Sequence, residues 1–190
     1  MIFKIIGFFL YVSVVANSYG QAARYIGSQE CQSCHEGVYQ EWQQSHHKKA
    51  MQHVSEIAVL GDFDTSELST PLGLVTFYRK KTEFWVDIPN KGGITESFKI
   101  SYTFGYKPLQ QYMVEFPDGR IQLIPYSWDS RTKQEGGQRW FNLYPEQTNK
   151  HQEFYWTNTG QNWNYMCADC HSTNVKKNFD VKTNSITTQL

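Results

Sequence analysis

Apolar and polar residues alternate along several stretches in the middle of the chain. The alternating stretches are residues 75–78, 84–88, 98–104 and 112–116. A period of two that is sustained over several runs is typical of strands that bury one face. Turn-forming residues separate the runs, with Pro, Asn and Gly at 89–93 and a Pro-Asp-Gly sequence at 117–119. Residues 111–124 are therefore expected to form a hairpin within an antiparallel sheet of about four or five strands.

A different pattern flanks this region on both sides. Residues 36–42 have helical spacing, because Val38 and Trp42 are four positions apart and share one face of a helix. The polar stretch 127–137 is expected to form a loop, and residues 140–156 are rich in aromatic side chains. The expected fold class is α+β, in which short helices and loops flank an inserted antiparallel β-sheet. The expected regions are 21–60, a β-rich region at 61–150, and 151–190.

The first twenty residues have the pattern of a signal peptide. Lys4 provides a positive charge, residues 5–16 are uncharged and largely apolar, and Ser18 and Gly20 are small residues at the −3 and −1 positions of a cleavage site. The apolar run is shorter than the roughly 18 residues expected of a membrane-spanning helix. We expect residues 1–20 to be a signal peptide, with an uncleaved anchor as the alternative. The rest of the chain is then exported to the periplasm or outside the cell, and no membrane span remains after cleavage.

Charge and motifs exclude several classes of function. The formal net charge is zero, whereas nucleic acid or an anionic membrane as a partner would require a concentrated basic face. The sequence has no hydrolase, nucleotide-binding or zinc-protease motif. Asp118 and Asp129 are interpreted as turn residues rather than a catalytic pair.

All four cysteines lie in two Cys-x-x-Cys pairs, and a histidine follows each pair directly. The two motifs consist of Cys31, Cys34 and His35, and of Cys167, Cys170 and His171. An even number of cysteines in an exported chain is typical of disulfides, and paired Cys-x-x-Cys sequences are also typical of structural zinc sites. The third interpretation is the covalent attachment of two c-type haems, for which Cys-x-x-Cys-His is the signature.

The haem interpretation accounts for every position of the motif. The two thiols add to the two vinyl groups of the porphyrin, and a helical turn brings both sulfur atoms to the porphyrin edge. The adjacent His35 or His171 then faces the iron as the proximal ligand. Zinc and disulfides leave the two histidines unexplained. We therefore expect two covalently bound haem c groups.

The sixth ligand of each iron has several candidates. They are His46, His47, His53, His151, Met51, Met113 and Met166. His46 and His47 are adjacent, so on a helix their side chains point about 100° apart and only one reaches a given iron. We favour His47, with Met51 one turn later as the alternative. In a third interpretation both histidines are solvated surface residues.

Longer stretches around these motifs resemble a known family. Residues 27–35 and 42–51 resemble the haem-binding segments of the cytochrome c-554-type multihaem family. The later stretches 102–105, 108–112, 135–141 and 161–174 resemble a branch of it that carries tetratricopeptide repeats towards the C-terminus. The resemblance implies electron transfer between closely packed haems, with redox proteins as partners. It also implies that His47 is an axial ligand, to a haem other than the one at Cys31.

The same resemblance bears on the organisation of the chain. Members of this branch continue to further Cys-x-x-Cys-His motifs and then to helical repeats. We therefore expect the chain to be the N-terminal part of a longer protein. Its first haem-binding segment is then 21–60, and 151–190 is a truncated second one, with further haem domains beyond Leu190.

Three functions from different classes remain open from the sequence. The first is an electron carrier without a substrate of its own, which two histidine-closed sites and the lack of a catalytic motif favour. The second is a haem enzyme with one open iron position, such as a nitrogen-oxyanion reductase or a peroxidase. The third is a haem-free interaction module held by zinc or disulfides. We expect the electron carrier rather than the enzyme.

Overall fold

The computed structural model describes residues 24–189, so the expected signal peptide at 1–20 lies outside the described residues. The chain divides into two compact units, of which one ends at Glu36 and the other begins at Gly37. The described part of the first unit contains the 3-10 helix η1 (Ser28–Cys31), and α2 (Glu36–Gln44) begins at its last residue. No helix in residues 24–189 is long and apolar enough to cross a membrane.

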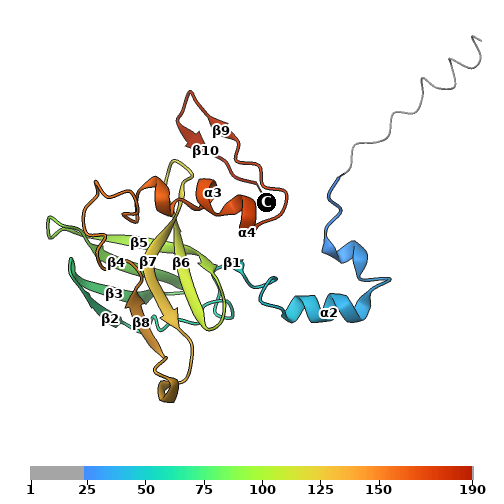
Figure 1. The fold of residues 1–190 in the computed structure, drawn as a ribbon, viewed down its shortest axis with the longest axis horizontal. Coiled ribbons are helices and arrows are strands. Elements are labelled where there is room, and N and C mark those ends of the chain that lie inside the picture. The colour runs from blue at the N-terminus through green and yellow to red at the C-terminus, as the bar shows by residue number, and fades with distance from the viewer. Residues whose placement is uncertain (1–23, 190) are drawn as a thin grey trace, which may run out of the picture. The chain divides into compact units, whose positions relative to one another are not determined.

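The second unit is built on an antiparallel sheet of eight strands (Figure 1). The strands are β1 (Met51–His53), β2 (Ser66–Thr70), β3 (Gly73–Lys80), β4 (Glu83–Pro89), β5 (Thr95–Phe104), β6 (Leu109–Glu115), β7 (Ile121–Asp129) and β8 (Arg139–Asn142). Strands β2 to β8 are neighbours in chain order, and β1 pairs with β5. The other elements are η2 (Lys133–Glu135), η3 (Thr159–Gln161), α3 (Trp163–Met166), α4 (Ala168–His171) and the hairpin β9 (Phe179–Asp180) and β10 (Ser185–Ile186). The expected antiparallel sheet between the two cysteine motifs is present, with more strands than expected and only a few short helices.

The sheet rolls up until β8 lies near β2. The ring of Trp140 in β8 stacks on Phe77 of β3, with the ring centroids 3.7 Å apart. Its Nε1 donates to the carbonyl oxygen of Asp62 at 3.0 Å and to Oγ of Ser66 in β2 at 2.9 Å. These contacts join the last strand of the meander to the first, so the sheet forms a nearly closed barrel.

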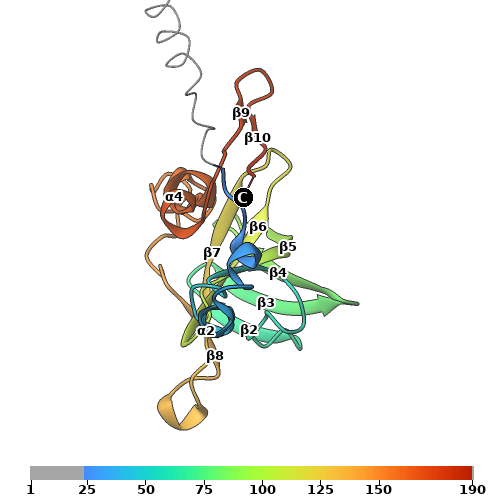
Figure 2. The same ribbon diagram turned by 90° about the vertical axis from the view of Figure 1, so that its right-hand side faces the viewer.

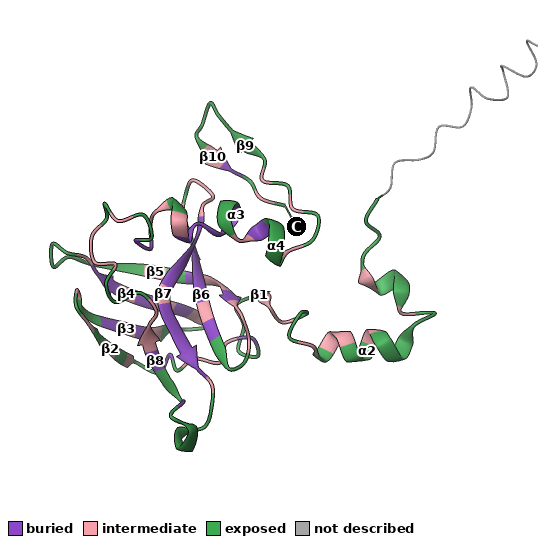
Figure 3. Ribbon diagram, viewed as in Figure 1, coloured by how far each residue is buried: buried purple, intermediate pink, exposed green. Residues whose placement is uncertain are grey.

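Side chains of β6 and β7 alternate between two separate cores. Tyr112 and Ile124 point into the core that the rolled sheet encloses, where most of the buried aromatic residues lie. Met113 and Leu123, each one position away, point to the opposite face and pack against Trp163 of α3. This second cluster is called the outer core below. Buried residues therefore follow both strands, and α3 and α4 lie beside β7 over the outer face (Figures 2 and 3).

The helix expected at 36–42 is present as α2, but it does not continue to the histidine pair. Ser45 closes its last turn, because the Ser45 N–H and hydroxyl both donate to the carbonyl oxygen of Trp42, at 3.0 and 2.6 Å. Residues 45–50 form turns and bends, and Met51 begins β1. The expectation that Met51 lies one helical turn after His47 is therefore wrong.

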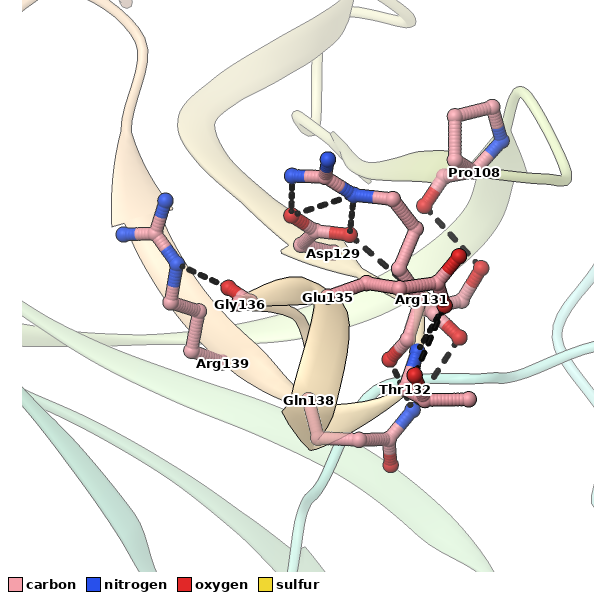
Figure 4. Close-up of polar contacts among 9 residues, drawn as sticks. Pro108, Asp129, Arg131, Thr132, Glu135, Gly136, Gln138 and Arg139 are labelled. Atoms are coloured by element: carbon pink, nitrogen blue, oxygen red, sulfur yellow. Dashed lines mark hydrogen bonds and ion pairs between the residues drawn. The ribbon is translucent and has the colours of Figure 1, made fainter.

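The connection from β7 to β8 is held by its own polar side chains (Figure 4). Arg131 donates to both carboxylate oxygens of Asp129, whose side chain is 1% exposed. The N–H and hydroxyl of Thr132 bond to the Glu135 carboxylate, and the amide of Gln138 donates to the Arg131 carbonyl. The loop expected at 127–137 thus begins only after Asp129, because residues 127–129 belong to the buried end of β7.

The contact between Asp129 and Arg131 predicts a specific loss of stability in acid. Hydrogen bonds from Arg131 lower the pKa of Asp129 to about 2, from an ordinary value of about 3.9. Because the folded pKa is the lower one, the contribution is complete above about pH 4 and is lost as the pH falls through about 2. We expect the urea midpoint of the parent protein to fall more steeply over this range than that of Asp129→Asn. Equal slopes for the two proteins would contradict the prediction.

Candidate functional site

Each Cys-x-x-Cys-His motif forms one helical turn. In the second motif the N–H of His171 donates to the carbonyl oxygen of Cys167 at 3.0 Å. In the first motif the N–H of His35 donates to the carbonyl oxygen of Cys31 at the same distance. Such a turn places the two cysteines and the histidine of each motif near one another, as the haem interpretation requires.

The second motif is anchored to β7 by buried amide side chains. Asn162 accepts the N–H of Tyr165, which caps α3, and donates to Oε1 of Gln122 in β7 at 2.7 Å. Asn164 accepts the backbone N–H of Ile121 at 2.7 Å and donates to the carbonyl oxygen of Gly119. The main chain leading into Cys167 is therefore held on the outer face of the barrel.

Reasoning from the sequence did not single out these amides. Asn162 and Asn164 are 2% and 0% exposed, and Gln122 is fully buried. Amide side chains are ordinarily on the surface, and only their partners in three dimensions show why these are not. The available signal was the Asn-Trp-Asn sequence at 162–164, which ends two residues before the Cys-x-x-Cys-His motif and has a large apolar residue between two polar ones.

The four cysteines are all free thiols. Cys31, Cys34 and Cys170 are exposed, while Cys167 is half-buried against the outer core. Burial raises the pKa of the Cys167 thiol, and the neighbouring Cys170 raises it further. Cys167 is thus a neutral thiol at neutral pH.

A pocket of about 390 Å³ opens beside the second motif. It is lined by His46, His47, Ala50, Phe104, Gly105, Tyr106, Lys107, Pro108, Leu109 and His171. Two of these residues, His47 and His171, were predicted from the sequence as ligands of haem iron. They lie far apart along the chain and come together on one pocket.

Pairing of β1 with β5 brings the histidine pair to this place. Met51 lies opposite Phe104 in the ladder, and the N–H of Gly105 donates to the carbonyl oxygen of Ala50 at 2.7 Å, which extends the pairing by one step. Gly105 has φ +81°, and a Cβ atom there would lie 2.8 Å from the carbonyl oxygen of Leu109. The turn after β5 therefore needs glycine. The ring of Phe104 meets His171 edge-on, with centroids 5.2 Å apart.

The other candidates for the sixth ligand lie in different surroundings. Met51 packs in the outer core together with the fully buried Met113. The ring of His53 contacts Tyr102 with centroids 4.8 Å apart, away from the pocket lining. His151 is exposed in a turn, and Met166 is exposed on α3. Only His46 and His47 share the pocket with His171 among the candidates in residues 24–189.

The two histidines of the pair differ in what their rings touch. The ring of His46 lies edge-on to Tyr106, with centroids 5.6 Å apart. No ring contact of His47 is found within residues 24–189. Both side chains are exposed at the pocket. The role of either as an iron ligand stays a prediction.

The composition of the pocket fits a haem. Phe104, Leu109 and Ala50 offer an apolar wall for a flat porphyrin, and imidazole nitrogens are ordinary axial ligands of haem iron. The thiols that would form the thioether bonds belong to the same turn as His171. The residues present therefore suit the cofactor that the motif implies.

Comparison with known proteins supports a c-type cytochrome for one part of the chain. Residues 30–67 match the family described as cytochrome c554 and c-prime. The matched residues include the first motif, α2 and the histidine pair. No curated protein and no solved structure matches the chain. A cytochrome c554-type segment is thus present, as the resemblance predicted, and covalently bound haem c is the cofactor of c-type cytochromes.

Proposed function

We propose, from the cytochrome c554-type segment at 30–67, that this protein is an exported c-type cytochrome that carries two haem c groups and transfers electrons between redox partner proteins. The observation that carries the proposal is the pocket shared by His171 of the second motif and the histidine pair after the first. A motif histidine and a second imidazole on one pocket would supply the two ligands that a closed haem site needs.

The cysteines of each motif would hold one haem through thioether bonds. Cys167 and Cys170 would attach one haem, with His171 as its proximal ligand. Cys31 and Cys34 would attach the other, with His35 in the same role. The helical turn found at both motifs supports this assignment, because it is the local geometry that attachment at two neighbouring vinyl groups requires.

His47 would be the distal ligand of the haem at the second motif. It lines the pocket of His171, and the ring of its neighbour His46 packs against Tyr106 instead. A histidine in the sixth position leaves no site for a substrate on that iron, which favours an electron carrier over an enzyme.

The bound haem would supply one-electron redox chemistry at this site. The chain would orient it through His171 and exclude water from one side through Phe104 and Leu109. The network of Asn162, Asn164 and Gln122 would keep the attachment turn fixed on β7. Two imidazole ligands would give this haem a lower reduction potential than a histidine–methionine pair would.

The number of covalent haems tests the proposal directly. We expect the full-length chain, made in a host that matures c-type cytochromes, to give two haems per chain in a pyridine haemochrome assay, one for each motif. Replacing Cys31 and Cys34 by serine should leave one haem, and so should replacing Cys167 and Cys170. A parent protein that contains zinc and no haem would overturn the proposal.

A further inference from the structure

Two lysine side chains meet at one aromatic ring on the pocket that His47 and His171 share. The Nζ of Lys49 lies 4.6 Å from the centroid of the Tyr106 ring, and the Nζ of Lys107 lies 5.5 Å from it. Tyr106 and Lys107 line the pocket, and Lys49 directly precedes the lining residue Ala50. Both ammonium groups therefore lie close to this pocket.

Neither ammonium group forms an ion pair with a carboxylate in the described part of the chain. The ion pairs of residues 24–189 engage Arg79, Lys99, Arg120, Arg131 and Lys177. Lys49 and Lys107 are not among them. The face of Tyr106 attracts each ammonium group, but the two groups repel each other. A ligand with two negative charges would relieve this repulsion.

We propose that Lys49 and Lys107 bind the propionate carboxylates of the haem attached at Cys167 and Cys170. The inference rests on the proposed function, because it needs a haem in this pocket. Haem carries two negatively charged propionates. The two ammonium groups at the pocket, which form no ion pair, equal them in number and are opposite in charge. The apolar residues Phe104 and Leu109 of the same pocket suit the rest of the porphyrin.

The pairing has a measurable consequence for the reduction potential. Propionates carry negative charge near the iron and favour its ferric state, and lysines that neutralise them favour the ferrous state. Removing both lysines therefore lowers the potential of this haem. We expect a change of about tenfold in the equilibrium constant for reduction, which is about 59 mV for a one-electron couple.

Redox titration of the full-length holoprotein tests the assignment. In the Lys49→Gln/Lys107→Gln variant one of the two haem components should shift to lower potential, while the other keeps the parent value. Arginine at both positions should keep the parent potential, and glutamate should lower it beyond glutamine. If the two lysines only packed against the ring of Tyr106, the reduction potential would not follow the charge of the substituted side chain in this way. If the double variant is poorly folded, each single glutamine variant should still shift the same component in the same direction by a smaller amount.

Lys80 provides a matched control. Its Nζ lies 3.8 Å from the ring centroid of Trp85 and 5.3 Å from that of Tyr78, so it also stacks on aromatic rings. It belongs to β3 and does not line the pocket. Lys80→Gln removes the same charge and should leave both potentials at the parent values.

The outcomes separate this inference from the proposed function. Unchanged potentials in a Lys49→Gln/Lys107→Gln protein that retains both haems would overturn the lysine assignment alone. An equal shift in Lys80→Gln would also overturn it, because the effect would then be a general one of net charge. A parent protein without haem at Cys167 and Cys170 would overturn the proposed function and the lysine assignment together. The pyridine haemochrome assay detects that case separately from the redox titration.

Discussion

Replacing His47 by alanine is expected to open the sixth position of the haem at the second motif, whereas replacing His46 is expected to leave that position closed. Both residues line the pocket of His171, but the ring of His46 packs against Tyr106, whereas no ring contact of His47 is found within residues 24–189. Loss of an imidazole ligand converts a six-coordinate low-spin iron to a high-spin iron with an open position. A high-spin ferric signal and binding of carbon monoxide after reduction should therefore appear at one haem of His47→Ala.

His46→Ala is the matched control for this experiment, since it removes the same side chain from the same pocket. If His46→Ala gives the high-spin signal and His47→Ala does not, the ligand is His46 and our assignment is wrong. If the parent protein itself binds carbon monoxide or cyanide at one haem, that haem has an open position. The enzyme alternative would then replace the electron carrier.

Trp140→Ala is expected to cost about 3–5 kcal/mol of the free energy of unfolding, as is usual for removing a buried tryptophan. Trp140 is 7% exposed and stacks on Phe77, and its Nε1 joins β8 to Ser66 of β2. Small domains are stable by only about 5–15 kcal/mol, so this loss is a large fraction of the total. The urea midpoint of the holoprotein, followed by near-ultraviolet circular dichroism, measures it.

Trp140→Phe separates the hydrogen bonds of Trp140 from its packing. Phenylalanine keeps an aromatic ring against Phe77 but donates to neither Asp62 nor Ser66, so we expect a smaller loss, of which about 1 kcal/mol comes from hydrogen bonding. Equal losses for the two variants would show that the Nε1 contacts between β8 and β2, rather than ring packing, hold the sheet closed.

The alternating pattern predicted the central strands well and the outer ones poorly. Strands β3 to β6 lie where apolar and polar residues alternate, because each of these strands has one face in a core. Strand β2 is short and polar, and β8 has only four residues, so neither contains enough alternation to be recognised. Strand β7 was predicted to end near 124 but runs to Asp129, because the barrel buries polar residues such as Ser127 at its end.

The helix after the first motif shows a limit of reasoning from spacing. Val38 and Trp42 correctly predicted α2, but spacing carried no information on where the helix would end. The hydroxyl of Ser45 ends it by bonding back to Trp42, and Met51 then enters the sheet. The preference for His47 over His46 thus rests on the pocket and on Tyr106 rather than on helical geometry.

The sequence by itself determined the two Cys-x-x-Cys-His motifs, because the chemistry of haem attachment involves residues within one turn of the chain. Tertiary structure alone decided which histidine shares a pocket with which motif. The pairing of β1 with β5 brings His47 to the pocket that His171 also lines, and buried amides of Asn162 and Asn164 hold the second motif on β7. Contacts between strands distant in the chain depend on the folding of the whole sheet, and no local pattern encodes them.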